Sequence, residues 1–179
     1  SWLPVDEIKE IVIVDWSSDV PVVELPYVKN SLGKKIKVVR TEGEHYFDRC
    51  KALNLAYAYT NPDNPLLLRI DIDYILKDKS WLENLKVGRD GELNYFLATV
   101  SQATPCLAGF ILVNKRDFEP GYNENFLPMW GHEDTDLNYR IIKKRGVRRQ
   151  AFLSVENFIY HVPHDDSMRI QHMEMKQLN

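Results

Sequence analysis

Two aspartates, Asp71 and Asp73, come directly after the apolar segment 66–70 (LLLRI). Ligands of open α/β sheets bind beyond the carboxyl ends of the strands, so a pair of carboxylates at this point is well placed to meet one. Carboxylate oxygens suit hard divalent ions such as Mg²⁺ and Mn²⁺. The pair therefore predicts a site for a divalent ion and its diphosphate, although the same triplet also occurs in solvated turns.

A second group of acidic residues lies in the segment 130–136 (WGHEDTD), where Glu133, Asp134 and Asp136 fill three of four positions. Acidic residues at the start of a helix stabilise its dipole, which accounts for some of them. Carboxylates packed this closely repel one another, and proteins tolerate such repulsion mostly where the group has a use. One of these carboxylates is a candidate general base toward a hydroxyl group.

Three further polar groups are candidates for the same chemistry. His161 and His164 follow a predicted strand, and imidazole binds Mn²⁺ and Zn²⁺ well. Arg49 lies near the start of a predicted helix, where a cation does not favour the dipole and could answer a phosphate. Asp15 ends a predicted strand and could bind a base or a ribose. Taken alone, these features also fit a surface histidine pair, a solvated helix face and a plain loop.

Strand-like and helix-like segments alternate along the chain, which predicts an α/β fold. Strands are expected over residues 10–15, 37–40, 66–70, 96–101, 107–113, 148–154 and 158–162. Helices are expected over residues 46–60, 80–87 and 133–145, and an aromatic loop rich in Gly, Pro and Asn over 119–131. In this arrangement the candidate residues lie at strand ends and helix starts.

Composition narrows the class of protein. The chain has 179 residues, 44% of them hydrophobic and 27% charged, which is typical of one globular domain. Its net charge of -3 argues against a nucleic-acid partner. Two cysteines are too few for a disulfide scaffold and fit a reducing compartment, so a cytoplasmic location is expected. The longest apolar runs are far shorter than the roughly 20 residues of a membrane helix, and no signal peptide is visible.

Three of these segments, in their order along the chain, resemble the motifs of a known family. Residues 47–54 (FDRCKALN) resemble the Phe-Asn-Arg-Ala-Lys-Leu-Leu-Asn helix of the β-1,4-galactosyltransferases and their bacterial relatives. Residues 71–73 resemble the Asp-Val-Asp motif of that family, and residues 130–136 its Trp-Gly-Gly-Glu-Asp-Asp-Asp motif. Residues 107–109 stand where the family has a strand with paired glycines. The resemblance spans about residues 10–165.

The resemblance implies a fold and an activity. The fold is the GT-A fold, a Rossmann-like mixed sheet flanked by helices, here a single domain over residues 1–179 that lacks its usual first strand and helix. The implied activity is that of a metal-dependent, inverting, galactosyltransferase-like hexosyltransferase. Such an enzyme moves a sugar from a nucleotide diphosphate-sugar, first of all a UDP-sugar, to a hydroxyl of a glycan or other acceptor. The implied cofactor is Mn²⁺ or Mg²⁺.

The resemblance also implies roles for single residues. Asp73 would bind the metal directly, with His161 as the first choice for a histidine ligand and His164 as the second. Asp71 would lie near the donor ribose and the metal. Asp134 would take the proton of the acceptor hydroxyl, and Glu133 would help to hold the acceptor.

The donor would be held by residues from other segments. Arg49 would face the nucleotide diphosphate, and Trp130 would line the sugar pocket. Two departures from the family pattern bear on this site: Asp48 replaces an asparagine, and His132 replaces a glycine beside the expected base.

Three expectations concern the molecule as a whole. The strand over residues 10–15 is expected to lie inside the sheet, with one neighbour supplied by sequence outside this chain or by a second copy in a homodimer. A non-catalytic module that binds a sugar or nucleotide is the main alternative to a transferase. A metal-dependent phosphohydrolase, which would release inorganic phosphate, is the weaker alternative.

Overall fold

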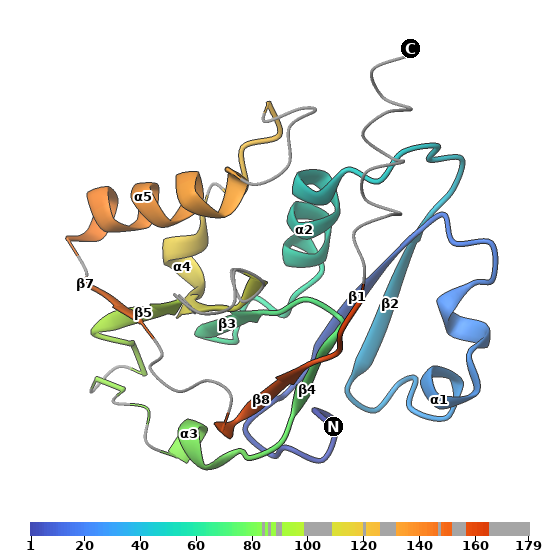
Figure 1. Ribbon diagram of the computed structural model, residues 1–179, viewed down its shortest axis with the longest axis horizontal. Helices are drawn as coiled ribbons and strands as arrows, with labels where there is room; N and C mark the ends of the chain where they lie inside the picture. Colours follow the sequence, from blue (N-terminus) through green and yellow to red (C-terminus); the bar gives the residue numbers. More distant parts are fainter. Residues whose placement is uncertain are drawn as a thin grey trace. The chain divides into compact units, whose positions relative to one another are not determined.

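The structure is a computed structural model of the chain, shown in Figure 1. It describes residues 1–83, 85, 87–88, 91–98, 109–119, 121–125, 132–146, 148–151 and 157–164. The chain folds into two compact units. The first is built from Ser1–Glu7, Asp63–Pro120 and Asp134–His164, and the second includes Ile8–Pro62 and Gly121–Glu133. Within the described part of the chain, no helix is long and apolar enough to cross a membrane.

The second unit contains a parallel pair of strands. β1 (Ile11–Trp16) and β2 (Ile36–Thr41) are rich in β-branched residues, which favour extended backbone. The connection between them contains η1 (Val22–Glu24) and α1 (Pro26–Lys29). Because the pair is parallel, both strands end at the same edge, and the register places Asp15 opposite Arg40.

Helix α2 (Arg49–Ala58) follows β2 in the second unit. Asp48 caps its start, because its carboxylate accepts a hydrogen bond from the backbone N–H of Lys51. The helix therefore begins later than the expected residue 46. The Asp48 that departs from the family motif thus has a local structural function, since aspartate and asparagine both cap helices well.

The first unit is organised around a four-stranded sheet. Its strands are β3 (Leu66–Arg69), β5 (Tyr95–Ala98), β6 (Ile111–Asn114) and β7 (Arg148–Ala151). They lie in the order β3-β6-β5-β7, with β3 and β5 antiparallel to β6 and with β7 parallel to β5. The mixed α/β architecture confirms the fold class expected from the sequence.

Side chains alternate along a strand, so each strand of this sheet contributes residues to both of its faces. Leu66 and Leu68 of β3 pack on one face, together with Leu112 of β6. The cluster that they join is made of buried apolar residues: Tyr74, Trp81, Leu93, Phe110, Leu112 and Ile159. Ile111 and Val113 point to the opposite face and are also buried. Helices α4 (Lys115–Phe118) and α5 (Glu133–Arg145) lie on one side of the sheet, and α3 (Ser80–Glu83) lies on the other (Figure 1).

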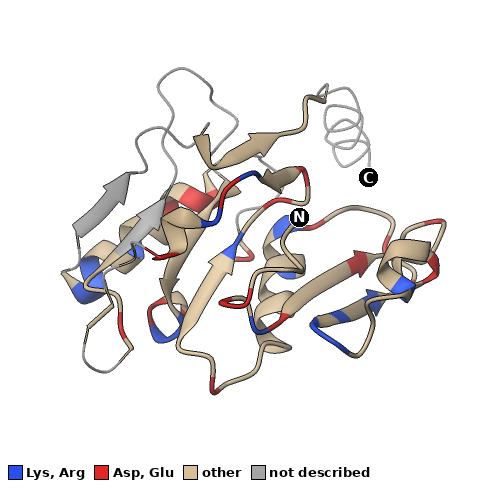
Figure 2. Ribbon diagram, turned by 90° about the horizontal axis from the view of Figure 1, so that it is seen from below, with Lys and Arg blue, Asp and Glu red and all other residues tan. Residues whose placement is uncertain are grey.

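Helix α5 has the bounds that the sequence predicts. Its start is acidic and its last turn carries Lys143, Lys144 and Arg145, so its charges complement the dipole at both ends (Figure 2). Gly146 follows with a φ of 61° and donates its N–H to the carbonyl of Ile142 at 2.9 Å. A left-handed glycine at this position is a common end of a helix.

A separate pair of strands carries the candidate metal ligands. β4 (Tyr74–Leu76) pairs antiparallel with β8 (Ile159–His161), and Tyr74 lies opposite His161. The pairing continues one step further, because the N–H of Val162 donates to the carbonyl of Asp73 at 2.9 Å. The sequence did not predict β4. Its pairing with β8 brings Asp73 beside His161.

Several expected elements are shorter than predicted. The strand expected over 96–101 is β5, and the one expected over 107–113 is β6, while residues 99–108 lie outside the described residues. The helix expected over 80–87 is the single turn of α3. At the start of this turn, the hydroxyl of Ser80 donates to Oδ2 of Asp78 at 2.9 Å. The described strands form three separate sheets, not one.

Candidate active site

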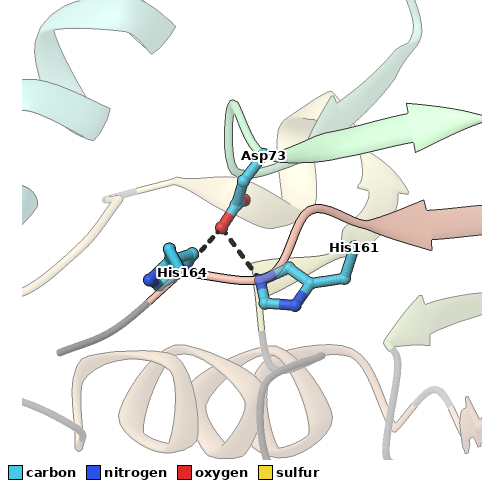
Figure 3. Close-up of side chains that lie close together, drawn as sticks. All are labelled: Asp73, His161 and His164. Atoms are coloured by element: carbon cyan, nitrogen blue, oxygen red, sulfur yellow. Dashed lines mark hydrogen bonds and ion pairs between the residues drawn. The ribbon is translucent and has the colours of Figure 1, made fainter.

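Three potential metal ligands meet in the first unit. Nε2 of His161 and Nε2 of His164 each lie 2.9 Å from the same oxygen of Asp73, Oδ2 (Figure 3). The three ligand atoms all lie within 4.8 Å of one another. The sequence left the choice between the two histidines open, and in the structure both converge on the same carboxylate.

The geometry and chemistry of this group fit a divalent ion. The second oxygen of Asp73, Oδ1, is buried and has no hydrogen-bond partner in the described part of the chain. A buried carboxylate oxygen without a partner is costly, and a bound cation would satisfy it. Two imidazole nitrogens and a carboxylate suit Mn²⁺ or Zn²⁺ better than Mg²⁺, which prefers oxygen ligands and water.

A buried tyrosine packs against this group. Tyr74 is 2% exposed, and the centroid of its ring lies 5.3 Å from that of His161. Burial raises the pKa of the Tyr74 hydroxyl, and the nearby carboxylates of Asp71 and Asp73 raise it further. The hydroxyl therefore stays protonated and uncharged at neutral pH beside the two aspartates.

Asp71 lies against a glycine on the neighbouring strand. Arg69 is opposite Ile111 in the antiparallel β3–β6 ladder, so Asp71, two residues after Arg69, comes beside Gly109, two residues before Ile111. A Cβ atom at Gly109 would lie 1.9 Å from Oδ2 of Asp71, so any larger residue would displace this carboxylate. Gly109 matters to the site for this reason, and its place in the glycine-bearing segment 107–109 was the signal in the sequence.

Arg69 is a site residue that sequence reasoning missed. It is buried, with Nη2 at 3.0 Å from Asp71 Oδ1 and Nη1 at 3.6 Å from Asp134 Oδ1. The available signal was a single charge inside the apolar run LLLRI, because a buried charge needs partners. Asp134 lies at the start of α5, as the acidic helix start predicted, and its side chain is 12% exposed.

A second ion pair belongs to the other unit. Nη1 of Arg49 donates to Oε1 of Glu133 at 2.7 Å, and both side chains are largely buried. The anion that Arg49 meets in this structure is therefore the carboxylate expected to hold an acceptor. Its role toward a diphosphate stays a prediction, as does that of Glu133 toward an acceptor.

Asp15 is held by its own unit. Its carboxylate accepts hydrogen bonds from the N–H groups of Ser18 and Val22 at 3.1 and 2.9 Å, and from Nη1 of Arg40 at 2.7 Å. Burial is the largest single effect on this group and opposes its ionisation, but these hydrogen bonds together outweigh it and lower the pKa to about 2. Asp15 therefore fastens the turn after β1, and its role toward a ribose or base stays a prediction.

Two candidate residues, Trp130 and His132, precede the acidic helix start in the sequence. Trp130 lies outside the described residues. His132 is exposed to solvent immediately before α5.

The fold is similar to that of known structures. No protein-family model matches the chain, and no curated protein matches it. Its structure is similar to the catalytic domain of Drosophila β-1,4-galactosyltransferase 7 in complex with xylobiose. That match has a TM-score of 0.56 and 16% identity, and covers 90% of this chain and 74% of the other.

A second similar structure is a mutant of the same Drosophila enzyme in complex with manganese, UDP-Gal and xylobiose. It matches with a TM-score of 0.54 and 15% identity, over 88% of this chain and 73% of the other. Likeness at this identity concerns the fold. The chain has the GT-A fold of a galactosyltransferase domain, which confirms the fold that the sequence motifs implied.

Proposed function

We propose that this protein is a metal-dependent glycosyltransferase of the inverting, galactosyltransferase-like kind. It would transfer a hexose from a nucleotide diphosphate-sugar, with a UDP-sugar as the first candidate, to a hydroxyl of a glycan or other acceptor. The observation that carries the proposal is the convergence of Asp73, His161 and His164 on a GT-A fold. The Drosophila relative with manganese and UDP-Gal supports the choice of metal and donor.

Asp73, His161 and His164 would hold the ion, for which Mn²⁺ is the first candidate and Mg²⁺ the second. When bound, the ion would offset the charge of the diphosphate and so make it a better leaving group. Asp71 is held between Arg69 and Gly109, and we assign it to the donor side of the site. The remaining chemistry belongs to the protein's own carboxylates.

Asp134 is the proposed general base. The acceptor oxygen would form a bond to the anomeric carbon while the bond from that carbon to the diphosphate oxygen breaks. The proton of the acceptor hydroxyl would pass to the Asp134 carboxylate, and the nucleoside diphosphate would leave with the bonding electrons. Attack from the face opposite the leaving group inverts the anomeric centre.

Binding of UDP in the presence and absence of Mn²⁺ tests the metal site. The variants Asp73→Ala, His161→Ala and His164→Ala should lose the Mn²⁺-dependent part of the affinity, because each removes one of the three converging ligands. Asp63→Ala, which alters an exposed carboxylate in the same unit, is the matched control and should bind as the unaltered protein does. Mn²⁺-dependent UDP binding that survives Asp73→Ala would overturn the assignment.

A second candidate is a non-catalytic module that binds a nucleotide or sugar. The observation in its favour is that Glu133 and Asp134 are both buried and both engaged by arginines. Release of UDP from UDP-Gal in the presence of Mn²⁺ separates the two functions. Binding without release would favour the module, and release of inorganic phosphate would indicate a phosphohydrolase instead.

A further inference from the structure

Arg69 connects two carboxylates that are far apart in the sequence. Its side chain is 5% exposed, and its two terminal nitrogens point to different partners: Nη2 to Asp71 and Nη1 to Asp134. Asp71 begins the Asp-x-Asp turn after β3, whereas Asp134 is the second residue of α5. The planar guanidinium of arginine carries donors in a fixed fork, so it holds two partners in one geometry.

The local structure gives this arginine little freedom. Arg69 is the last residue of β3 and lies in register with Ile111, a neighbour that is 1% exposed. Gly109 lies against the far side of the Asp71 carboxylate, which therefore sits between the guanidinium and the backbone of the adjacent strand. Asp134 is 9% exposed, so moving it away from the arginine would take a buried carboxylate out of this ion pair.

We propose that Arg69 is a positioning residue that fixes the Asp134 carboxylate relative to the Asp-x-Asp turn. The inference rests on the proposed function, in which Asp134 is the base and Asp71 belongs to the donor side. General-base catalysis requires the carboxylate to lie within hydrogen-bond reach of the acceptor hydroxyl while the donor is held. A rigid link between the two carboxylates supplies that alignment before substrates arrive.

The link itself is tested by thermal unfolding, which does not depend on any reaction. Arg69→Met, Asp134→Asn and the double variant are compared with the unaltered protein. Each single change breaks the ion pair and should therefore lower the melting temperature. Arg69→Met should lower it further, because the buried carboxylate of Asp134 then keeps its charge without the arginine. The double variant should unfold no lower than Arg69→Met alone, since the link is lost only once. Losses that simply add would overturn the link.

The positioning role is tested by Arg69→Lys. Lysine keeps the positive charge, but its ammonium is a point charge that cannot reach two carboxylates as a fork. We expect kcat for sugar transfer to fall by about 100-fold, which is typical of a base displaced by about 1 Å. The Mn²⁺-dependent affinity for UDP should stay unchanged, because Asp73 and both histidines are intact.

Arg145→Met is the matched control for this experiment. Arg145 also pairs with a buried aspartate, Asp117, but it lies at the opposite end of α5 from Asp134. The control should lower the melting temperature and leave kcat unchanged. If Arg69→Lys behaves as this control does, the positioning role is wrong. Absence of transfer by the unaltered protein would count against the proposed function instead, and the unfolding cycle would still decide for or against the link.

Discussion

The carboxylates of this protein carry out different tasks according to what surrounds them. Asp73 faces two histidines, Asp134 faces an arginine, and Asp15 is enclosed by backbone N–H groups and Arg40. A carboxylate that accepts hydrogen bonds from N–H donors on all sides has a structural role, because its lone pairs are not available to a ligand. A carboxylate with an unsatisfied buried oxygen, such as Asp73, is a better candidate for a ligand.

For Asp134, the proposed function predicts a loss of rate without a loss of donor binding. A general base acts in the transition state, so Asp134→Asn should lower kcat by roughly two to four powers of ten. The affinity for UDP with Mn²⁺ should be nearly intact, because no metal ligand changes. Steady-state kinetics and a binding titration on the same preparation measure both quantities. A lower melting temperature with an unchanged rate would leave Asp134 as a structural partner of Arg69.

For Asp15, the pKa predicts how stability depends on pH. The pKa falls from 3.8 in the unfolded chain to about 2 in the folded protein, which corresponds to about 2 kcal/mol of stability. Because the folded pKa is the lower one, this contribution is present above about pH 4 and is lost as the pH falls toward 2. Asp15→Asn should therefore lower the free energy of unfolding at pH 7 by about 2 kcal/mol.

Denaturant unfolding at several pH values checks this prediction. The difference between Asp15→Asn and the unaltered protein should shrink as the pH approaches 2. Asp19→Asn, in the same turn but exposed, is the control and should have little effect at any pH. A difference that stays constant across this pH range would mean that Asp15 acts through something other than its charge.

At the scale of elements, helix α2 holds a segment that lies far along the chain. Nδ2 of Asn54 donates to the carbonyl of Tyr122 at 2.9 Å and to Glu124 at 2.8 Å, and Oδ1 accepts from the N–H of Tyr122 at 2.8 Å. Gly121 precedes this contact with a φ of 87°, and a Cβ atom there would lie 2.4 Å from Oδ1 of Asn54. The amide therefore fits this segment only because residue 121 is a glycine.

This contact predicts that Gly121→Ala costs more than a positive φ alone. Gly43 has a similar φ of 74°, and a Cβ atom there would meet nothing within 4 Å, so Gly43→Ala reports the backbone cost, about 1–2 kcal/mol. Gly121→Ala should lose more stability than this control, because it also displaces Asn54. Combining it with Asn54→Ala should cost less than the sum of the two single changes. Equal losses for Gly121→Ala and Gly43→Ala, measured by denaturant unfolding, would contradict the clash.

The same scale shows where reasoning from sequence succeeds and where it stops. Helix α5 was predicted with its observed bounds because its acidic start, basic end and following glycine are all local signals. β4 was missed because three residues carry almost no periodicity, and its existence depends on pairing with β8, far along the chain. Arg69 was missed for a similar reason, since its second partner, Asp134, lies far along the chain. The candidate metal ligands could be named from the sequence because their residue types carry the chemistry themselves, and the structure brings Asp73, His161 and His164 together.

At the scale of the whole molecule, the candidate metal site belongs to one unit. Asp73, His161 and His164 are all in the first unit, whereas Asp15, Arg49 and Glu133 are in the second. The boundary falls between Glu133 and Asp134, which are adjacent in the chain. A metal that binds the folded first unit stabilises it by mass action. Mn²⁺ alone should therefore stabilise the unit that contains β4 and β8 against unfolding.

The edge of β1 that faces away from β2 has no partner strand among the described residues, and it carries the last prediction. Among the described residues, β2 is the one strand that pairs with β1, and the N–H of Ile11 points toward it, donating to the carbonyl of Lys35. N–H groups alternate in direction along a strand, so that of Val12 points to the opposite edge. An apolar strand with a free edge invites pairing with another chain. We expect this protein to form a homodimer through β1, which is one of the two possibilities that the sequence left open for this strand.

Sedimentation equilibrium of the unaltered protein and of Val12→Pro tests this dimer. Proline at Val12 removes a donor on the open edge and leaves the bonds to β2 in place, so this variant should remain folded and become monomeric. Ile13→Pro is the control, because it removes a donor on the β2 side and should unfold the strand pair instead. An unaltered protein that is monomeric at every concentration, with β1 amide protons protected from exchange, would show that this edge needs no second copy.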